Sequence, residues 1–268
     1  MYARGGRMNL PRFHLFEFED QPWFPCIVRD LATDYLCFIQ SALGLHRPIV
    51  PVLADALRAT GAREILDLCS GGGGPAISLQ ASLAAAGLST HVTLTDRFPN
   101  CRAFQRIADA SDGKIGFVAE RVDARFVPPW LGCFRTIFNS FHHFREADAK
   151  KILRDAAKGG HAIAIFEYPE RSAMIILLTL CLTPFLVALT TPFIRPFRWA
   201  RLFFTYLLPL VPLICWWDGL VSQLRAYTVD ELSALAYDAA PTSYQWNAGR
   251  IALPSSPGHL TYLVGHAR

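Results

Sequence analysis

The residues with the clearest chemical purpose lie in a glycine-rich stretch at positions 64–79. An apolar run with one carboxylate, Asp67, leads into four consecutive glycines at 71–74, and helix-compatible residues follow at 76–79. This order predicts a strand, a tight loop and a helix. Glycine accepts positive φ and lets the backbone lie against a ligand, while the free N–H groups of the following helix point at that ligand. We therefore expect a nucleotide-like molecule to bind at this loop.

Two classes of ligand fit the loop. The spacing Gly71-x-Gly73-x-x-Ala76 matches a dinucleotide fingerprint, and Asp96 follows at a usable distance. Asp67 favours a different ligand, because a carboxylate repels a pyrophosphate and attracts ammonium and sulfonium charges. A loop that only turns the chain is a third interpretation. We disfavour it because four glycines lose much conformational entropy when no ligand is bound.

The segment Asp67-x-Cys69-x-Gly71-x-Gly73 resembles the first motif of the class I S-adenosylmethionine (SAM) dependent methyltransferases, acidic-x-Gly-x-Gly-x-Gly, with Cys69 in place of the first glycine. The resemblance covers about residues 45–170 and 225–268. It implies a Rossmann-like α/β sandwich, with a mostly parallel seven-stranded sheet, a C-terminal antiparallel hairpin and SAM as the cofactor. A capping box at 228–231 and two strand-like pieces at 244–253 and 259–266 match this ending, whereas dinucleotide folds continue with a parallel sixth strand.

The cofactor-binding residues that the resemblance implies follow the ends of the predicted strands. Asp96 ends the second strand, where it is placed to accept hydrogen bonds from a ribose diol, or alternatively to cap a helix at 98–110. Asp123 follows the third strand, where the family's Asp reaches the adenine amino group. The set of implied cofactor residues is Asp67, Cys69, Ser70, Gly71, Gly73, Asp96, Arg97, Asp123, Ala124 and Asn139.

Three residues after the fourth strand are the candidate catalytic groups: Asn139, His142 and His143. Methyl transfer is an in-line displacement that chiefly needs alignment and exclusion of water. A general base is needed when the acceptor arrives protonated, and an imidazole can take a phenolic proton near neutral pH. Asn139 could orient the acceptor or the methionyl group of the donor. The alternative for paired histidines at such a junction is packing or capping.

We assign substrate contacts to Tyr35, which lies on an apolar helical stripe at 27–43, and to Glu167 and Arg171 at the end of the fifth strand. The alternatives are a core position for Tyr35 and an ion pair between Glu167 and Arg171. We expect Asp218 and Arg225 to pair. No metal ligands are assigned, because the spacing of the histidines and acidic residues is not diagnostic.

Composition places these residues in one α/β domain with an insertion. The chain has 268 residues, is 52% hydrophobic and 18% charged, and carries a net charge of +4 without a basic run, which argues against nucleic acid as a partner. Seven cysteines without a CxxC pair predict reduced thiols in a cytoplasmic protein, and we see no secretory signal. The predicted parts are an aromatic segment with two cap helices (1–60), the SAM-binding core (61–171), a hydrophobic helical insert (172–224) and the closing helix and hairpin (225–268).

The insert contains two stretches without a charged residue, 172–194 and 202–217, separated by Arg195, Arg198 and Arg201. A membrane-spanning hairpin would put these arginines outside, against the positive-inside rule, and prolines interrupt both arms. A hairpin lying in the cytoplasmic membrane interface satisfies both constraints, so we expect peripheral association with the inner face of the membrane. The alternatives are a helical lid and a homodimer interface.

The apolar insert follows the fifth strand, beside the expected donor, and this predicts a hydrophobic small-molecule acceptor: a lipid, a quinone or an aromatic metabolite. The absence of an Asn-Pro-Pro-Tyr signature disfavours a planar amine. Two alternatives stay open for the function. One is different substitution chemistry on a quinone, and the other is a non-catalytic, SAM-binding, membrane-associated protein.

Overall fold

The computed structural model of the chain describes residues 10–240, 244–254 and 256–267. Residues 1–9 of the predicted aromatic segment, Ser255 of the predicted hairpin turn and Arg268 lie outside the described residues.

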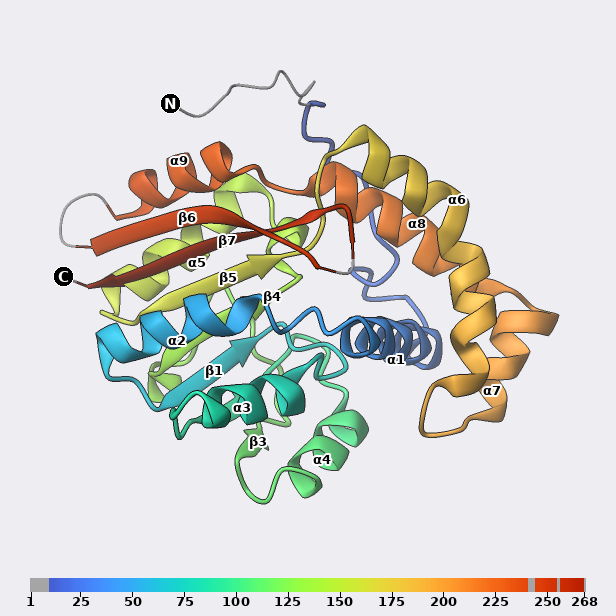
Figure 1. Ribbon diagram of the computed structural model, residues 1–268, viewed down its shortest axis with the longest axis horizontal. Coiled ribbons are helices and arrows are strands. Elements are labelled where there is room, and N and C mark those ends of the chain that lie inside the picture. Colours follow the sequence, from blue (N-terminus) through green and yellow to red (C-terminus); the bar gives the residue numbers. More distant parts are fainter. Residues whose placement is uncertain (1–9, 241–243, 255, 268) are drawn as a thin grey trace.

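A seven-stranded sheet in the order β3-β2-β1-β4-β5-β7-β6 forms the middle layer (Figure 1). The strands β1 to β5 are parallel, and β7 runs antiparallel to both β5 and β6. The mostly parallel sheet and its closing hairpin confirm the predicted fold class. The strands are β1 (Glu64–Leu68), β2 (His91–Leu94), β3 (Ile115–Phe117), β4 (Phe134–Phe138), β5 (Ile163–Glu167), β6 (Tyr244–Ala252) and β7 (His259–Ala267).

Helices cover both faces of the sheet because its strands are apolar on both sides. Ile65 packs into the core beneath α2, α3 and α4, whereas Leu66, the next residue of β1, packs into the core beneath α5 and α9. The covering helices are α2 (Ile49–Thr60), α3 (Ala76–Ala85), α4 (Cys101–Asp109), α5 (Glu146–Lys158) and α9 (Val229–Ala239).

Local signals set several of these boundaries. The Thr228/Glu231 capping box opens α9 with both of its hydrogen bonds formed, and Gly61 ends α2 with a φ of 66°. Asp96 does not cap α4, so this alternative is wrong: the helix begins at Cys101, and Asn100 accepts from the N–H of Ala103 at 3.1 Å. The reason is Pro99, which disfavours helical backbone at the residue before it.

The ends of β3 and β4 determine where the residues that follow them lie. β3 stops at Phe117, and its apolar continuation folds into the core instead. β4 stops at Phe138, because Asn139 takes a left-handed φ of 51° and the chain then turns into a 3₁₀ helix, Phe141–His143. This turn brings the two histidines to the carboxyl edge of the sheet.

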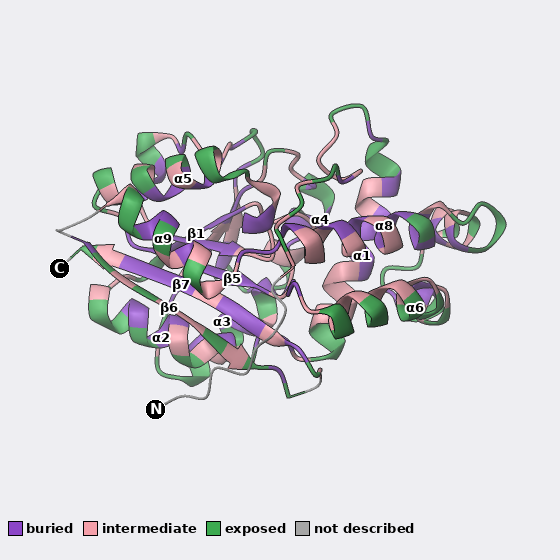
Figure 2. Ribbon diagram, turned by 90° about the horizontal axis from the view of Figure 1, so that it is seen from above, coloured by how far each residue is buried: buried purple, intermediate pink, exposed green. Residues whose placement is uncertain are grey.

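The insert and the N-terminal helix α1 (Cys26–Ala42) build a separate third core. Figures 1 and 2 show the insert helices projecting beyond the sheet as a lobe with α1 at its base. Of the two helices predicted as a cap, α1 packs against the insert, whereas α2 packs on the sheet. The insert contains α6 (Ala173–Thr190), a 3₁₀ turn (Thr191–Phe193), α7 (Trp199–Leu202), a π-helical turn (Phe203–Leu207) and α8 (Leu210–Arg225).

A buried ion pair fixes the lobe to α1. The Arg201 guanidinium is 2% exposed, lies 2.6 Å from Asp34 of α1 and also donates to two backbone carbonyls of the insert turn. Arg198 lies 3.4 Å from the same carboxylate. Two of the three insert arginines therefore pair with α1.

Candidate active site

The loop after β1 has the backbone that its glycines predict. Gly71 and Gly73 have φ of 56° and 91°, and the N–H of Gly71 donates to Asp96 at 2.8 Å. A Cβ on Gly73 would lie 2.0 Å from Ile107 of α4, so this glycine is needed for packing as well as for its backbone conformation. A Cβ on Gly71 would meet only the edge of Thr33 at 4.0 Å. The loop thus has free space at Gly71, whereas Gly73 is closed against α4 and a Cβ on Gly72 would lie 3.0 Å from Cys37 of α1.

Cys69, which stands in place of the motif's first glycine, has a left-handed backbone. Its φ is 60°, in the region that costs a residue with a Cβ about 1–2 kcal/mol. Cys69 therefore stores strain at the mouth of the site.

We predict that Cys69→Gly raises the free energy of unfolding by about 0.5–1 kcal/mol, because relief of the left-handed strain exceeds the extra chain entropy and the lost packing. Urea unfolding measures this change. Cys101→Gly is the matched control: it sits in ordinary helical backbone at the start of α4 and should lower stability instead. A lower stability for Cys69→Gly would contradict the prediction.

Asp67 is buried under the loop. Its register partner on β4 is Thr136, whose hydroxyl donates to one carboxylate oxygen at 2.8 Å, while the Ser70 hydroxyl donates to the other at 2.6 Å. Burial raises the pKa of this carboxyl to about 7, against the lowering effect of the two hydroxyls. A cation next to Asp67 would stabilise its ionised form.

Two adjoining cavities, of about 290 and 350 Å³, meet at this loop and share Cys69, Gly71 and His143. The first runs from Asp67 to the α8 residues Asp218 and Gly219, so the insert forms part of its wall. The second lies over Asp96 and Arg97 at the end of β2. The predicted site residues that line one or both cavities are Asp67, Cys69, Ser70, Gly71, Gly73, Asp96, Arg97, Asn139, His142 and His143.

Asn139 carries a buried side-chain oxygen, Oδ1, that has no hydrogen-bond partner among the described residues. The residue lines the first cavity. A buried amide oxygen without a partner is costly, and a donor from a ligand would satisfy it. The Oδ1 of Asn139 fits the ammonium group of a SAM-like donor. The free space at Gly71 fits the close approach of the backbone to such a donor.

His142 is held by a carboxylate from behind. Its Nδ1 lies 2.5 Å from Glu167, which also accepts the N–H groups of Ser140 and Phe141 at 2.8 and 2.7 Å. The other ring nitrogen, Nε2, is buried and has no partner among the described residues. A hydrogen bond from Nδ1–H to Glu167 leaves the Nε2 lone pair without a partner on a residue that lines the first cavity.

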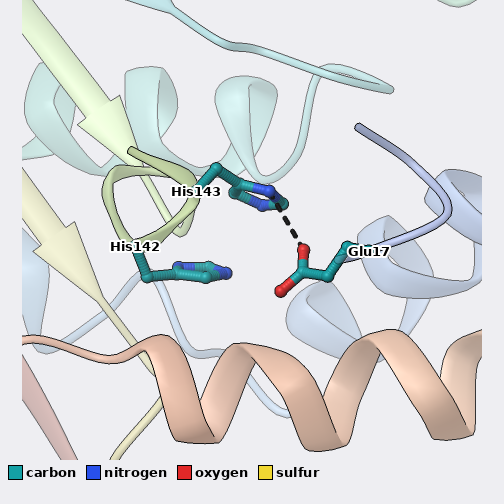
Figure 3. A group of neighbouring side chains, drawn as sticks. All are labelled: Glu17, His142 and His143. Carbon is teal, nitrogen blue, oxygen red and sulfur yellow. Dashed lines mark ion pairs between the residues drawn. The ribbon is translucent and has the colours of Figure 1, made fainter. Parts of the chain in front are cut away.

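His143 lies against His142 and faces Glu17 (Figure 3). Asp20 is a second carboxylate beside it, and the sequence singled out neither of the two. Its Nδ1 is 3.0 Å from Glu17 and 2.8 Å from Asp20. Burial alone lowers the pKa of His143, but these two carboxylates raise it well above its ordinary range.

The segment before α1 carries Glu17 and Asp20 into the site because α8 binds its backbone. Asp218 accepts from the N–H groups of Phe18 and Glu19 at 2.8 and 3.1 Å, and Arg225 lies 2.6 Å from Asp20. Asp218 and Arg225 therefore do not pair with each other as expected. No local sequence signal marks Glu17, since its partners come from distant parts of the chain.

Four predicted site residues lie elsewhere. Tyr35 is buried in the core between α1 and the insert, and Arg171 pairs with Glu231 of the capping box. Both carboxylate oxygens of Asp123 are bound by Arg125, at 2.6 and 2.9 Å, and Ala124 is in the core beneath α5. None of the four lines either cavity.

Glu167 also lines neither cavity, because it acts from beneath as the partner of His142. The alternative pairing of Glu167 with Arg171 is likewise not formed.

No protein-family model and no curated protein matches the chain. Among solved structures, an O-methyltransferase family protein from Burkholderia thailandensis is 16% identical with a TM-score of 0.47, covering 86% of this chain and 58% of its own. A putative O-methyltransferase from Nostoc punctiforme is 13% identical with a TM-score of 0.45, covering 80% and 54%. The plantazolicin methyltransferase BamL, solved with SAH and a triazolic desmethylPZN analog, is 10% identical with a TM-score of 0.49, covering 91% of this chain and 99% of its own.

The chain spans little more than half the length of the first two of these proteins. The strand order and the register of the sheet, rather than these likenesses, establish that the chain has the Rossmann-like α/β sandwich expected of class I methyltransferases.

Proposed function

We propose that the protein is a SAM-dependent methyltransferase that acts on an apolar small molecule at the cytoplasmic face of the membrane. The observation that carries the proposal is one cavity lined by the glycine loop, Asn139 and His142, in which the buried Oδ1 of Asn139 and Nε2 of His142 have no hydrogen-bond partner among the described residues. The second cavity, over Asp96 and Arg97, gives room for the adenosyl part of the donor.

The residues of this chain align the reactants and handle one proton. When bound, SAM supplies an electrophilic methyl group on a sulfonium for in-line displacement. Asn139 would hold the ammonium end of the donor, and Asp67 would balance its positive charge. As the carbon–sulfur bond breaks and the new carbon–oxygen bond forms, Nε2 of His142 accepts the proton of an acidic hydroxyl acceptor. Glu167 keeps the imidazole in the required tautomer and orientation.

Calorimetry with SAM, followed by transfer of labelled methyl from SAM into a membrane lipid extract, tests the proposal. Binding followed by a labelled lipid-soluble product is expected. Binding without a product would favour a non-catalytic SAM-binding protein. Binding of NAD in place of SAM would overturn the cofactor assignment.

The apolar lobe supports the membrane part of the proposal. The segment Ala173–Phe193 is long and apolar enough to cross a membrane, with a mean hydropathy of 2.4, and only 6% of it is buried. Phe185 and Leu189 are 74% and 70% exposed, and such a concentration of exposed apolar side chains marks an interaction surface. The pairing of Arg201 and Arg198 with Asp34 keeps the insert turn on α1, which supports a lobe lying in the interface over a spanning hairpin.

Vesicle flotation tests the membrane contact. The wild type is expected to float with anionic vesicles, and Phe185→Glu/Leu189→Glu should abolish flotation. The control is Phe126→Glu/Trp130→Glu, because these side chains are 66% and 71% exposed but lie on the sheet domain. A dimer in sedimentation that the lobe variant dissociates, without any flotation, would assign the lobe to a second copy of the chain instead.

The raised pKa of Asp67 gives the proposed cofactor contact a pH signature. Below pH 7 the free protein holds a proton on Asp67, and a cationic donor must displace it. We predict that the Kd for SAM rises by up to about tenfold per pH unit below 7 and levels off above it. Calorimetry across pH 5.5–8.5 measures this profile, and Asp67→Asn should flatten it. The same slope in wild type and variant would exclude contact between Asp67 and the donor.

A further inference from the structure

Glu17, His142 and His143 form a compact group of potential metal ligands at the junction of the two cavities. One ligand atom from each residue lies within 4.8 Å of the others. Figure 3 shows both imidazole rings and the Glu17 carboxylate pointing toward one another, the histidines from the turn after β4 and Glu17 from the segment before α1. Two imidazoles and one carboxylate with open positions are the donor set of many catalytic zinc and non-haem iron sites.

A second observation points to a ligand here. Nε2 of His142 is fully buried, has no hydrogen-bond partner among the described residues, and lies on the side of the ring toward Glu17. The opposite nitrogen contacts Glu167 at 2.5 Å. A metal-binding histidine typically donates its other N–H to a carboxylate, which fixes the tautomer that exposes the ligating lone pair.

The charge around the group favours a cation. Three carboxylates are in direct contact with the two imidazoles: Glu17, Asp20 and Glu167. One guanidinium, that of Arg225, opposes their charge. Once the ion has displaced the proton of His143, the carboxylates exceed the guanidinium by two charges, which one divalent cation balances. Asp20 contacts the same Nδ1 of His143 as Glu17, at 2.8 and 3.0 Å, so it adds a further carboxylate beside this nitrogen.

We propose that Glu17, His142 and His143 bind a divalent first-row transition-metal ion, with at least one coordination position open to the first cavity. Zinc–ligand bonds of about 2.0–2.2 Å place the ligand atoms about 3.4 Å from one another. Side-chain rotations that move each ligand atom by less than about 1 Å therefore complete the site. Glu167 orients His142 through its other ring nitrogen.

The ion would also have a role in the proposed methyl transfer, and this role rests on the proposed function. With the ion bound, Nε2 of His142 is coordinated and no longer accepts a proton. An ion held by these three residues would supply an open position for the acceptor hydroxyl and would lower the pKa of that hydroxyl, so that its proton would pass to solvent and the oxygen could displace sulfur from the methyl group. Metal binding itself does not depend on methyl transfer and can be measured without it.

The test uses the full chain after chelation and removal of the chelator. Titration with Co²⁺ is expected to give visible d–d absorption that saturates at one equivalent, and Zn²⁺ should displace it. Zn²⁺ should also raise the melting temperature, because an ion that binds only the folded state stabilises it. SAM binding is measured on the same chelated sample, so failure of the metal site and failure of the proposed function are distinguished.

Variants locate the ion. Glu17→Gln and His142→Gln should lose the Co²⁺ absorption, and Glu167→Gln should weaken Co²⁺ binding by about 10–100-fold through the lost orientation of His142. His91→Gln removes an exposed histidine at the opposite edge of the sheet and should bind Co²⁺ like the wild type. Circular dichroism confirms that each variant is folded. The proposal is overturned if the folded wild type takes up no stoichiometric Co²⁺, or if both ligand variants, folded, bind it unchanged.

Discussion

Replacement of His142 by Asn is expected to lower the rate of methyl transfer by about 10²–10⁴-fold and to leave the Kd for SAM within about twofold of the wild type. The expected loss is large because Nε2 of His142 is the unsatisfied nitrogen in the first cavity, and it serves the acceptor whether it holds a proton or an ion. SAM affinity should persist because the glycine loop, Asp96 and Asn139 are unchanged.

Single-turnover transfer of labelled methyl at saturating SAM measures this effect, with calorimetry for SAM affinity. His91→Asn is the control, since this side chain pairs with Glu64 away from both cavities and should keep the wild-type rate. An unchanged rate in folded His142→Asn would remove His142 from the chemistry while leaving the SAM site intact.

Replacement of Asp34 by Leu is expected to lower the free energy of unfolding by about 3–5 kcal/mol. The variant leaves the guanidinium of Arg201, which is 2% exposed, without its carboxylate partner at 2.6 Å. Water cannot compensate the charge there, because the surrounding core of α1 and the insert is apolar. The loss should appear as a lower urea midpoint at an unchanged slope.

The double variant Asp34→Leu/Arg201→Leu should recover most of this stability, because the pair is replaced by apolar groups instead of being broken. Asp55→Leu is the matched surface control. Asp55 forms a 3.2 Å pair with Arg58 in which the side chains are 81% and 52% exposed, and its loss should cost less than about 0.5 kcal/mol. An equal, small loss for Asp34→Leu would mean that the insert is not anchored through this pair.

The contacts of α8 connect the lobe with the site. One end of α8 packs with α1 and α6, and the other carries Asp218 and Arg225, which bind the segment that presents Glu17. The first cavity also opens against α8 through Gly219. The same helix α8 therefore contacts the lobe, the cavity wall and the segment that presents Glu17.

The sequence by itself determined the features that depend on neighbouring residues. Three local signals are present in the structure as the sequence predicts: the glycines after β1, the Thr228/Glu231 capping box and Gly61 at the end of α2. The placement of Asp96 and Asn139 beside the glycine loop also followed from the sequence, because the carboxyl ends of neighbouring parallel strands meet at one edge of the sheet.

Tertiary structure alone decided which side chains are available for chemistry. Arg125 occupies the carboxylate of Asp123, and the insert buries Tyr35. Conversely, α8 brings Glu17 to the histidines although nothing near Glu17 in the sequence marks it. The physical reason is that hydrogen bonds and ion pairs between distant segments form only once packing has fixed their geometry, whereas glycine conformations and helix caps are set by the residues themselves.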